Sequence, residues 1–322
     1  MKQSGDGRVL PARGGSLDPR LYQIAVLASL LLYGMTRLDF EVNAGRALLI
    51  LGTALAAQLA CTRLWALPRY DPRSALISGL SLCLLLRTPA AAVAIAAAVA
   101  AIASKFVLRW RGKHLFNPTN VALVAALLAS ERAWVSPGQW GSAAFFGFLV
   151  ACLGGLVVNR AARSDVTFAF LAAYAGLLLA RAAWLGDPIA IPVHQLQSGA
   201  LLIFAFFMIS DPKTTPDSRA GRVLFACLVA AGGYLVRFRL FEPNGLLYAL
   251  AAFAVCVPFI DRVLPGRRYR WEEPRPLPAV SAARPVTTEI STPARLPLPA
   301  PAASFRRHAC ELREELLERR TR

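Results

Sequence analysis

The hydrophobic residues of this chain are grouped in long blocks instead of alternating with polar residues. Blocks such as Ala90 to Val107 and Gly141 to Val158 are each followed by a basic connector. A helix needs about 20 apolar residues to cross a hydrocarbon layer about 30 Å thick. The pattern therefore predicts an all-α integral membrane protein with ten transmembrane helices: Leu21–Met35, Ala47–Cys61, Ser74–Leu86, Ala90–Val107, Asn117–Ala129, Gly141–Val158, Phe168–Trp184, Gln197–Ile209, Val223–Val236 and Gly245–Ile260.

Two of these segments are short for a full span. Ser74–Leu86 and Gln197–Ile209 each contain 13 residues. Segments of this length suit half-helices, in which a helix breaks inside the membrane beside a polar opening.

Composition supports the membrane interpretation and excludes two other classes. Of the 322 residues, 56% are hydrophobic and 17% are charged, which is too apolar for an ordinary soluble enzyme. The net charge of +17 could indicate a nucleic-acid-binding protein. However, Lys and Arg gather in the tails and short connectors, and no basic stripe is interleaved with aromatic residues. We therefore expect the lipid bilayer, and no nucleic acid, as a partner.

The distribution of basic residues predicts the orientation. An even number of helices places both termini on one side, and the connectors and N-terminal tail of that side carry 16 Lys and Arg before Arg262, against seven on the other side. Cytoplasmic loops are enriched in Lys and Arg. We expect a multi-pass protein of the bacterial inner (cytoplasmic) membrane with N-in and C-in termini, and residues 1–20 as a cytoplasmic tail. This tail has no cleavage site after an apolar run, so we expect Leu21 onward to be retained as an anchor.

An internal repeat divides the membrane region. Ser78-Gly79 and Ser198-Gly199 open short apolar runs about 120 residues apart. Phe116-Asn117-Pro118 and Phe241-Glu242-Pro243 each precede a further apolar helix. Two halves of five helices, residues 21–130 and 131–261, have opposite orientations because five is odd, and this is the inverted-repeat plan. The alternative is coincidence in an Ala- and Leu-rich background.

The composition changes after Asp261. Residues 262–303 are rich in Pro and Ala and are predicted to form a disordered linker. Residues 304–322 are predicted to form an amphipathic C-terminal helix, with Phe305, Ala309, Leu312 and Leu316 on one face. The sequence leaves open whether this helix lies on the membrane surface or docks on a partner.

Polar residues within membrane segments are candidate site residues because they are costly there. Asn117 and Asn120 begin a helix at Pro118, where they could contact a ligand or ion, or Asn117 could cap the helix. Asp211 could contact an ion or proton, or form a turn with Thr214. Inverted repeats bring their broken helices to a shared interface, so we expect one central site formed by Ser78, Asn117, Asn120, Ser198, Asp211 and Asn244.

Other chemistry is not indicated. The six cysteines show no closely spaced pairs, which argues against a disulfide framework and a thiolate metal site. His114 and His194 are isolated in the sequence, and no nucleophile–base–acid set or Gly-rich phosphate loop is present. No catalytic or metal-binding residue is therefore assigned, and whether the protein is an enzyme is left open.

Several of these motifs resemble the RnfD/NqrB family of membrane redox-complex subunits. They are Phe116-Asn117-Pro118, the run from Phe206 to Pro216, Arg222, Gly245, and Pro258-Phe259-Ile260-Asp261. The resemblance covers residues 21–270 and implies a ten-helix, two-repeat fold similar to urea transporters, with redox subunits as partners. The segments Asp18 to Gln23 and Trp134 to Gly141 resemble a narrower branch, the UnbU-like proteins associated with enediyne biosynthesis.

One family motif is missing. The resemblance implies FMN attached through its phosphate to the last Thr of a Ser/Thr-Gly-Ala-Thr motif, and Ser198-Gly199-Ala200 ends instead in Leu201. We therefore expect no covalent FMN, while the cofactor is left unknown and a non-covalent flavin stays open. The resemblance implies an RnfD-like subunit associated with electron transport or coupled ion or solute transport. The alternatives are a stand-alone channel or transporter for a small solute, and a membrane partner of a secondary-metabolite pathway.

Overall fold

The structure is a computed structural model that describes residues 18–37, 42–136 and 164–269. The chain divides into two units, Met1–Trp271 and Glu272–Arg322, and every described residue belongs to the first. The predicted span Gly141–Val158, the C-terminal helix 304–322 and most of the linker 262–303 lie outside the described residues. The described elements are α1 (Pro19–Arg37), α2 (Ala44–Leu64), α3 (Arg73–Leu85), β1 (Leu86–Arg87), α4 (Ala91–Val107), β2 (Arg109–Trp110), β3 (Lys113–His114), α5 (Pro118–Ala129), β4 (Trp134–Val135), α7 (Ser164–Leu185), α8 (Ala190–Leu196), α9 (Gly199–Ile203), the π-helix η1 (Phe204–Met208), α10 (Arg219–Arg239), α11 (Gly245–Ala254) and α12 (Val257–Val263).

The described chain is mostly helical, and side-chain caps set the start of three helices. Asn43, Asn117 and Ser218 each accept a hydrogen bond from a backbone N–H in the first turn of α2, α5 and α10. Pro118 stands at the first position of α5, where its missing N–H costs nothing. The capping interpretation of Asn117 is therefore confirmed.

Three helices are long and apolar enough to cross a membrane by themselves, namely α2, α7 and α10. The number rises to five if the bent pairs α8 with α9–η1 (49°) and α11 with α12 (52°) each form one span. Helices α3, α4 and α5 are apolar but contain only 13, 17 and 12 residues. The structure thus supports a membrane protein with three to five candidate spans among the described residues, while the count of ten stays a prediction.

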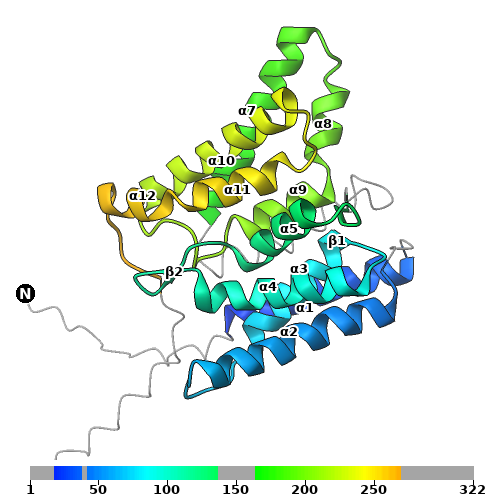
Figure 1. Cartoon of the computed structure of the whole chain (residues 1–322). Helices are drawn as coiled ribbons and strands as arrows, with labels where there is room; N and C mark the ends of the chain where they lie inside the picture. Colours follow the sequence, from blue (N-terminus) through cyan, green and yellow to red (C-terminus); the bar gives the residue numbers. More distant parts are fainter. Residues whose placement is uncertain (1–17, 38–41, 137–163, 270–322) are drawn as a thin grey trace, which may run out of the picture. The chain divides into compact units, whose positions relative to one another are not determined.

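The helices pack in corresponding pairs in the two parts of the chain (Figure 1). Helix α2 lies along α4, and α4 along α5; similarly, α7 lies along α10, and α10 along α11. Helices α5 and α11 contact each other. Glycines permit the close approach of α10 and α11, since a Cβ on Gly245 would lie 2.6 Å from the carbonyl oxygen of Gly233.

Two local features of the described chain were not predicted. Two-residue strands form antiparallel pairs, β1 with β4 and β2 with β3, where the chain leaves one helix for another. The short helix α8 was also not predicted, because Ala190–Leu196 precedes the apolar run that drew the prediction to Gln197.

The predicted short segment Gln197–Ile209 forms α9 and then the π-helix η1. Side chains donate hydrogen bonds to three carbonyl oxygens of this π-helix. Thr167 donates to the carbonyl oxygen of Ala205 (2.9 Å), Ser210 to that of Phe206, and Asn117 to that of Met208 (3.2 Å). The irregular backbone is therefore held from α7, from the chain that follows, and from the start of α5.

Candidate functional site

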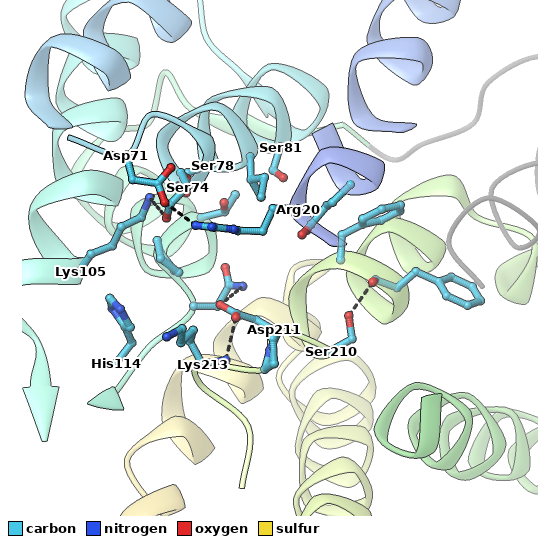
Figure 2. A pocket seen from close by; sticks show the side chains of 18 residues that line it. Arg20, Asp71, Ser74, Ser78, Ser81, Lys105, His114, Ser210, Asp211 and Lys213 are labelled. Atoms are coloured by element: carbon cyan, nitrogen blue, oxygen red, sulfur yellow. Dashed lines mark hydrogen bonds and ion pairs between the residues drawn. The ribbon is translucent and has the colours of Figure 1, made fainter. Parts of the chain in front are cut away.

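A polar cavity of about 340 Å³ lies among the ends of α3, α4, α5 and η1. Its charged and hydroxyl-bearing side chains come from segments far apart in the sequence (Figure 2). We call it the N-side cavity, because every connector that contributes to it is predicted to lie on the side of the N-terminus. It is lined by Arg20, Gln23, Asp71, Ser74, Ile77, Ser78, Ser81, Lys105, His114, Asn117, Pro118, Thr119, Phe206, Phe207, Ser210, Asp211, Pro212 and Lys213.

Lys105 is the most unusual residue of this cavity. Only 5% of it is exposed, and its Nζ donates to the carbonyl oxygen (2.8 Å) and the hydroxyl (3.0 Å) of Ser74. Among the described residues no carboxylate oxygen lies within 4.0 Å of its ammonium group. An ammonium group has three donors, so its third N–H is not used by Ser74. A buried cation in an apolar helix is a strong indication of function.

Asn117 and Asp211 connect the start of α5 to the end of η1. The amide oxygen of Asn117 caps α5 by accepting from Asn120 N (3.0 Å), and its Nδ2 lies 3.5 Å from Asp211 Oδ2. The other carboxylate oxygen of Asp211 accepts from Lys213 N (3.0 Å), and the backbone oxygen of Asp211 accepts from Thr214 N (3.2 Å), so the predicted turn with Thr214 is closed through the backbone. Capping and turn formation thus leave both side chains at the cavity wall.

An ion-pair network includes two residues of the cavity wall, Arg20 and Asp71. Arg20 binds Asp18 and Asp71, and Arg73 binds the same two carboxylates. Burial by itself raises the pKa of Asp18, but hydrogen bonds from Arg20 and Arg73 outweigh it and lower the pKa to about 2. These four charges hold the start of α1 against the start of α3.

A second cavity, of about 510 Å³, lies at the opposite ends of the broken helices. We call it the far cavity. Aromatic rings of Trp134, Tyr174 and Phe204 line it together with polar groups, and the guanidinium of Arg237 lies 3.3 Å from the hydroxyl of Tyr174. Its other lining residues are Leu85, Val135, Ser136, His194, Gln195, Gln197, Ser198, Ala200, Leu201, Met208, Pro243, Asn244, Leu246 and Leu247.

The two short segments connect these cavities in opposite directions. The first residues of α3 line the N-side cavity and its last residue, Leu85, lines the far cavity. Segment 198–211 begins at the far cavity with Ser198 and ends at the N-side cavity with Asp211. The two short segments therefore run antiparallel between the same two cavities.

Five of the six predicted site residues are divided between the two cavities. Ser78, Asn117 and Asp211 line the N-side cavity, whereas Ser198 and Asn244 line the far cavity. They were placed in one site because repeat-related positions were expected to meet at the membrane centre. Instead, the matching ends of antiparallel helices lie at opposite ends of the pair.

Asn120 lines neither cavity. Only 1% of it is exposed, and its Nδ2 donates to the carbonyl oxygen of Leu247 in α11 (3.1 Å), while its Oδ1 has no partner in the described structure. It therefore ties α5 to α11 between the cavities.

The sequence interpretation missed the cations and several hydroxyls of both cavities. Lys105 could have been found, because it is a lone charge within the apolar run Ala91–Val107. Arg20 and Lys213 were taken as topology signals or turn residues, and Tyr174 and Arg237 carry no motif. Arg20 and its partner Asp71 are 51 residues apart in the sequence, and Arg237 and its partner Tyr174 are 63 residues apart. The sequence alone therefore did not show that these side chains are close.

The part of the chain that forms the far cavity and one wall of the N-side cavity has recognisable relatives. Residues 131–270 match the NQR2, RnfD, RnfE family model. The chain is also 33% identical over 159 residues to the D subunit of the ion-translocating oxidoreductase complex of Erwinia tasmaniensis, and 33% identical over 115 residues to that of Haemophilus influenzae strain Rd.

These matches cover parts of each protein. The first spans 48% of this chain and 40% of the Erwinia protein, and the second 35% of this chain and 32% of the Haemophilus protein. The chain thus aligns with less than half the length of either relative. The predicted resemblance to RnfD proteins is confirmed, and the narrower resemblance to UnbU-like proteins stays a prediction.

Proposed function

We propose that the chain is an RnfD-like subunit of an ion-translocating oxidoreductase complex, embedded in a bacterial inner membrane. The observation that carries this proposal is the position of the matched stretch. Residues 131–270 include the broken segment α8–α9–η1, which reaches from one polar cavity to the other. The matched stretch therefore includes the segment that connects the two cavities, and two relatives that are similar to parts of this chain are each named as the D subunit of such a complex.

We further propose that the membrane region is an inverted repeat of ten helices. The antiparallel course of α3 and segment 198–211 supports this, as does the corresponding packing of α2, α4 and α5 with α7, α10 and α11. An inverted repeat places two broken helices side by side and opens a polar space at each end. An ion or small solute would pass between the spaces near Asn120, whose Oδ1 has no partner among the described residues.

The residues of the far cavity fit a flavin held without a covalent bond. A volume of about 510 Å³ lies within the range of pockets for small molecules, and three aromatic rings line it. Arg237 could pair with a phosphate. Leu201, which follows Ser198-Gly199-Ala200, is 5% exposed and has no hydroxyl to esterify. A bound flavin would supply electron-transfer chemistry.

Two spectroscopic measurements test the cofactor. Detergent-purified protein should show flavin absorbance that is lost from the protein after denaturation. In-gel fluorescence at the mass of the denatured protein should be absent, and a fluorescent band there would contradict the interpretation of Leu201. Absence of flavin absorbance in the native protein would remove the redox form of the proposal.

Co-purification tests the assignment as a subunit. A tagged chain, extracted in mild detergent, should carry other membrane or redox subunits with it. If it is isolated alone and conducts a small solute in vesicles, it is a stand-alone channel. If it carries enzymes of a secondary-metabolite pathway, it belongs with the UnbU-like branch.

Reporter fusions test the topology. Fusions after Met35, after Arg163 and at Arg270 should report outside, inside and inside, respectively, because ten spans with N-in and C-in termini require this pattern. A fusion after Arg163 that reports the outer side would contradict the count of ten helices.

A further inference from the structure

A third cavity, of about 210 Å³, lies where the β2–β3 hairpin meets the chain after α12. The hairpin turns at Arg111 and Gly112, which both have positive φ (50° and 78°), as the tight two-residue turn requires. Arg268 lies over this turn. Its guanidinium donates to the carbonyl oxygen of Arg111 (3.1 Å) and comes within 3.8 Å of the position of a Cβ on Gly112.

Positive charge is in excess around this cavity. Four cations line it, Arg109, Lys113, Lys213 and Arg268, together with one carboxylate, Asp217. Lys113 is already neutralised, because its Nζ binds Asp217 (3.0 Å) and Asp261 (2.7 Å). Within residues 18–37, 42–136 and 164–269, the other three cations make no ion pair within 4.0 Å.

The positive charges around this cavity also act on a neighbouring histidine, His114. His114 lines this cavity and the N-side cavity, and its Nδ1 is buried without a hydrogen-bond partner among the described residues. Burial and the positive charges of Arg109, Lys105, Lys213 and Arg268 lower the pKa of His114 to about 3. Cations gathered around one cavity repel each other, and an anion bound among them lowers this repulsion.

We propose that this cavity binds a phosphate group, held by the guanidinium groups of Arg109 and Arg268 and the ammonium group of Lys213. Guanidinium groups match phosphate oxygens with two parallel hydrogen bonds, and an ammonium group adds a point charge. The volume is below the range of about 300 to 1,000 Å³ typical of pockets for whole ligands. The cavity therefore takes a phosphorylated head group and not an entire nucleotide.

The phosphate could belong to an anionic lipid or to a soluble molecule. Trp110, which follows Arg109 in β2, is 55% exposed, and tryptophan is enriched at the membrane–water interface. The hairpin is predicted to lie on the cytoplasmic side, where anionic lipids attract basic residues. The two sources share one chemistry, and the experiment separates them.

The test compares the full-length protein with two doubly substituted variants in uncharged detergent. In the first, Arg109→Gln and Arg268→Gln remove two exposed cations from the cavity. In the control, Arg63→Gln and Arg69→Gln remove one exposed cation from the last turn of α2 and one from the α2–α3 connector, on the same predicted side of the membrane. Native mass spectrometry and equilibrium binding are then measured with phosphatidylglycerol, with phosphatidylcholine, and with inorganic phosphate.

The wild type and the control should bind one phosphatidylglycerol or one phosphate, and the cavity variant should bind about tenfold more weakly or worse. Stronger binding of phosphatidylglycerol than of phosphate identifies a lipid site, and the reverse identifies a soluble ligand. Binding that is equal in all three proteins, or absent from the wild type, would overturn the proposal. Unchanged gel-filtration profiles show that the variants are folded.

A second readout uses His114. An anion among Arg109, Lys213 and Arg268 offsets the charges that lower the pKa of this residue, so the ligand should raise that pKa in the wild type and the control. Imidazole ¹⁵N shifts measured against pH report it, and His114→Gln identifies the signal. A pKa that does not respond to any of the three ligands counts against the site. The proposal does not depend on electron transport, so it can fail separately from the proposed function.

Discussion

The ion pair between Asp165 and Arg222 should be the strongest charged contact between α7 and α10. Asp165 stands in the first turn of α7, and both of its oxygens accept from the Nε of Arg222 (3.0 and 2.9 Å), while Oδ2 also accepts from the terminal nitrogen Nη2. The side chains are only 11% (Arg222) and 14% (Asp165) exposed. Substituting Asp165→Asn leaves a buried guanidinium without its counter-charge.

The expected loss of unfolding free energy for Asp165→Asn is about 3 kcal/mol, because removing one partner of a buried pair typically costs about 3 to 5 kcal/mol. Loss of the negative charge at the helix start contributes about 0.5 kcal/mol of this. Asp187→Asn is the matched control. Its carboxylate makes one contact of 3.3 Å to Arg181, and the two side chains are 32% and 34% exposed, so the expected loss is about 0.5 kcal/mol.

Unfolding in mixed micelles with increasing dodecyl sulfate, followed by tryptophan fluorescence, measures both variants. The double variant Asp165→Asn with Arg222→Met should recover part of the loss, since it removes the unpaired guanidinium. Equal losses for Asp165→Asn and Asp187→Asn would refute the reasoning, and so would a loss below about 1 kcal/mol for Asp165→Asn.

Two further predictions concern a titrating side chain and a packing glycine. The pKa of His114 is about 3 in the folded protein and about 6.5 in the unfolded chain. As the pH falls, the unfolded chain therefore binds a proton before the folded protein does. The free energy of unfolding decreases by up to about 1.4 kcal/mol per pH unit between pH 6.5 and 3. Unfolding curves at pH 7.5 and 5 should show a smaller loss of stability for His114→Gln than for the wild type. Gly245→Ala should cost about 2 kcal/mol, because its Cβ would meet the backbone oxygen of Gly233 at 2.6 Å, whereas Gly52→Ala, with no atom within 4 Å, should be neutral or stabilising by about 0.5 kcal/mol. Melting curves in one detergent compare the two, and similar effects of both substitutions would contradict the packing argument.

Hydropathy predicts where the helices are because each apolar block forms its own backbone hydrogen bonds. Nine of the ten predicted segments lie within the described residues, and each coincides with a helix or a pair of helices. The cap at Asn117 and the turn at Asp211 were also visible, since both bonds are made within three residues. Helices, and hydrogen bonds between residues close in the sequence, could therefore be predicted from the sequence.

The remaining features depend on residues far apart in the chain. Lys113 was assigned to a basic connector, yet it binds Asp217 and Asp261, which lie 104 and 148 residues away. The π-helix η1 is set by hydrogen bonds from Thr167 and Asn117, and no local pattern in the run Phe204–Met208 requires them. Such contacts depend on the tertiary fold, so they could not be predicted from a single sequence.

The division of the candidate residues between two cavities depends both on a local sequence pattern and on the tertiary fold. Each short segment contains a small polar pair, Ser78-Gly79 or Ser198-Gly199, and this similarity suggested that the pairs meet. When two related helices run antiparallel, corresponding residues lie at opposite ends, and only positions near the middle approach each other. Residues close to that middle are therefore the ones to expect between the cavities, and Asn120, buried and bonded to the backbone of Leu247, is such a residue. A path from one side to the other would be controlled there, whereas Ser78 and Ser198 would contact a solute at its first and last steps.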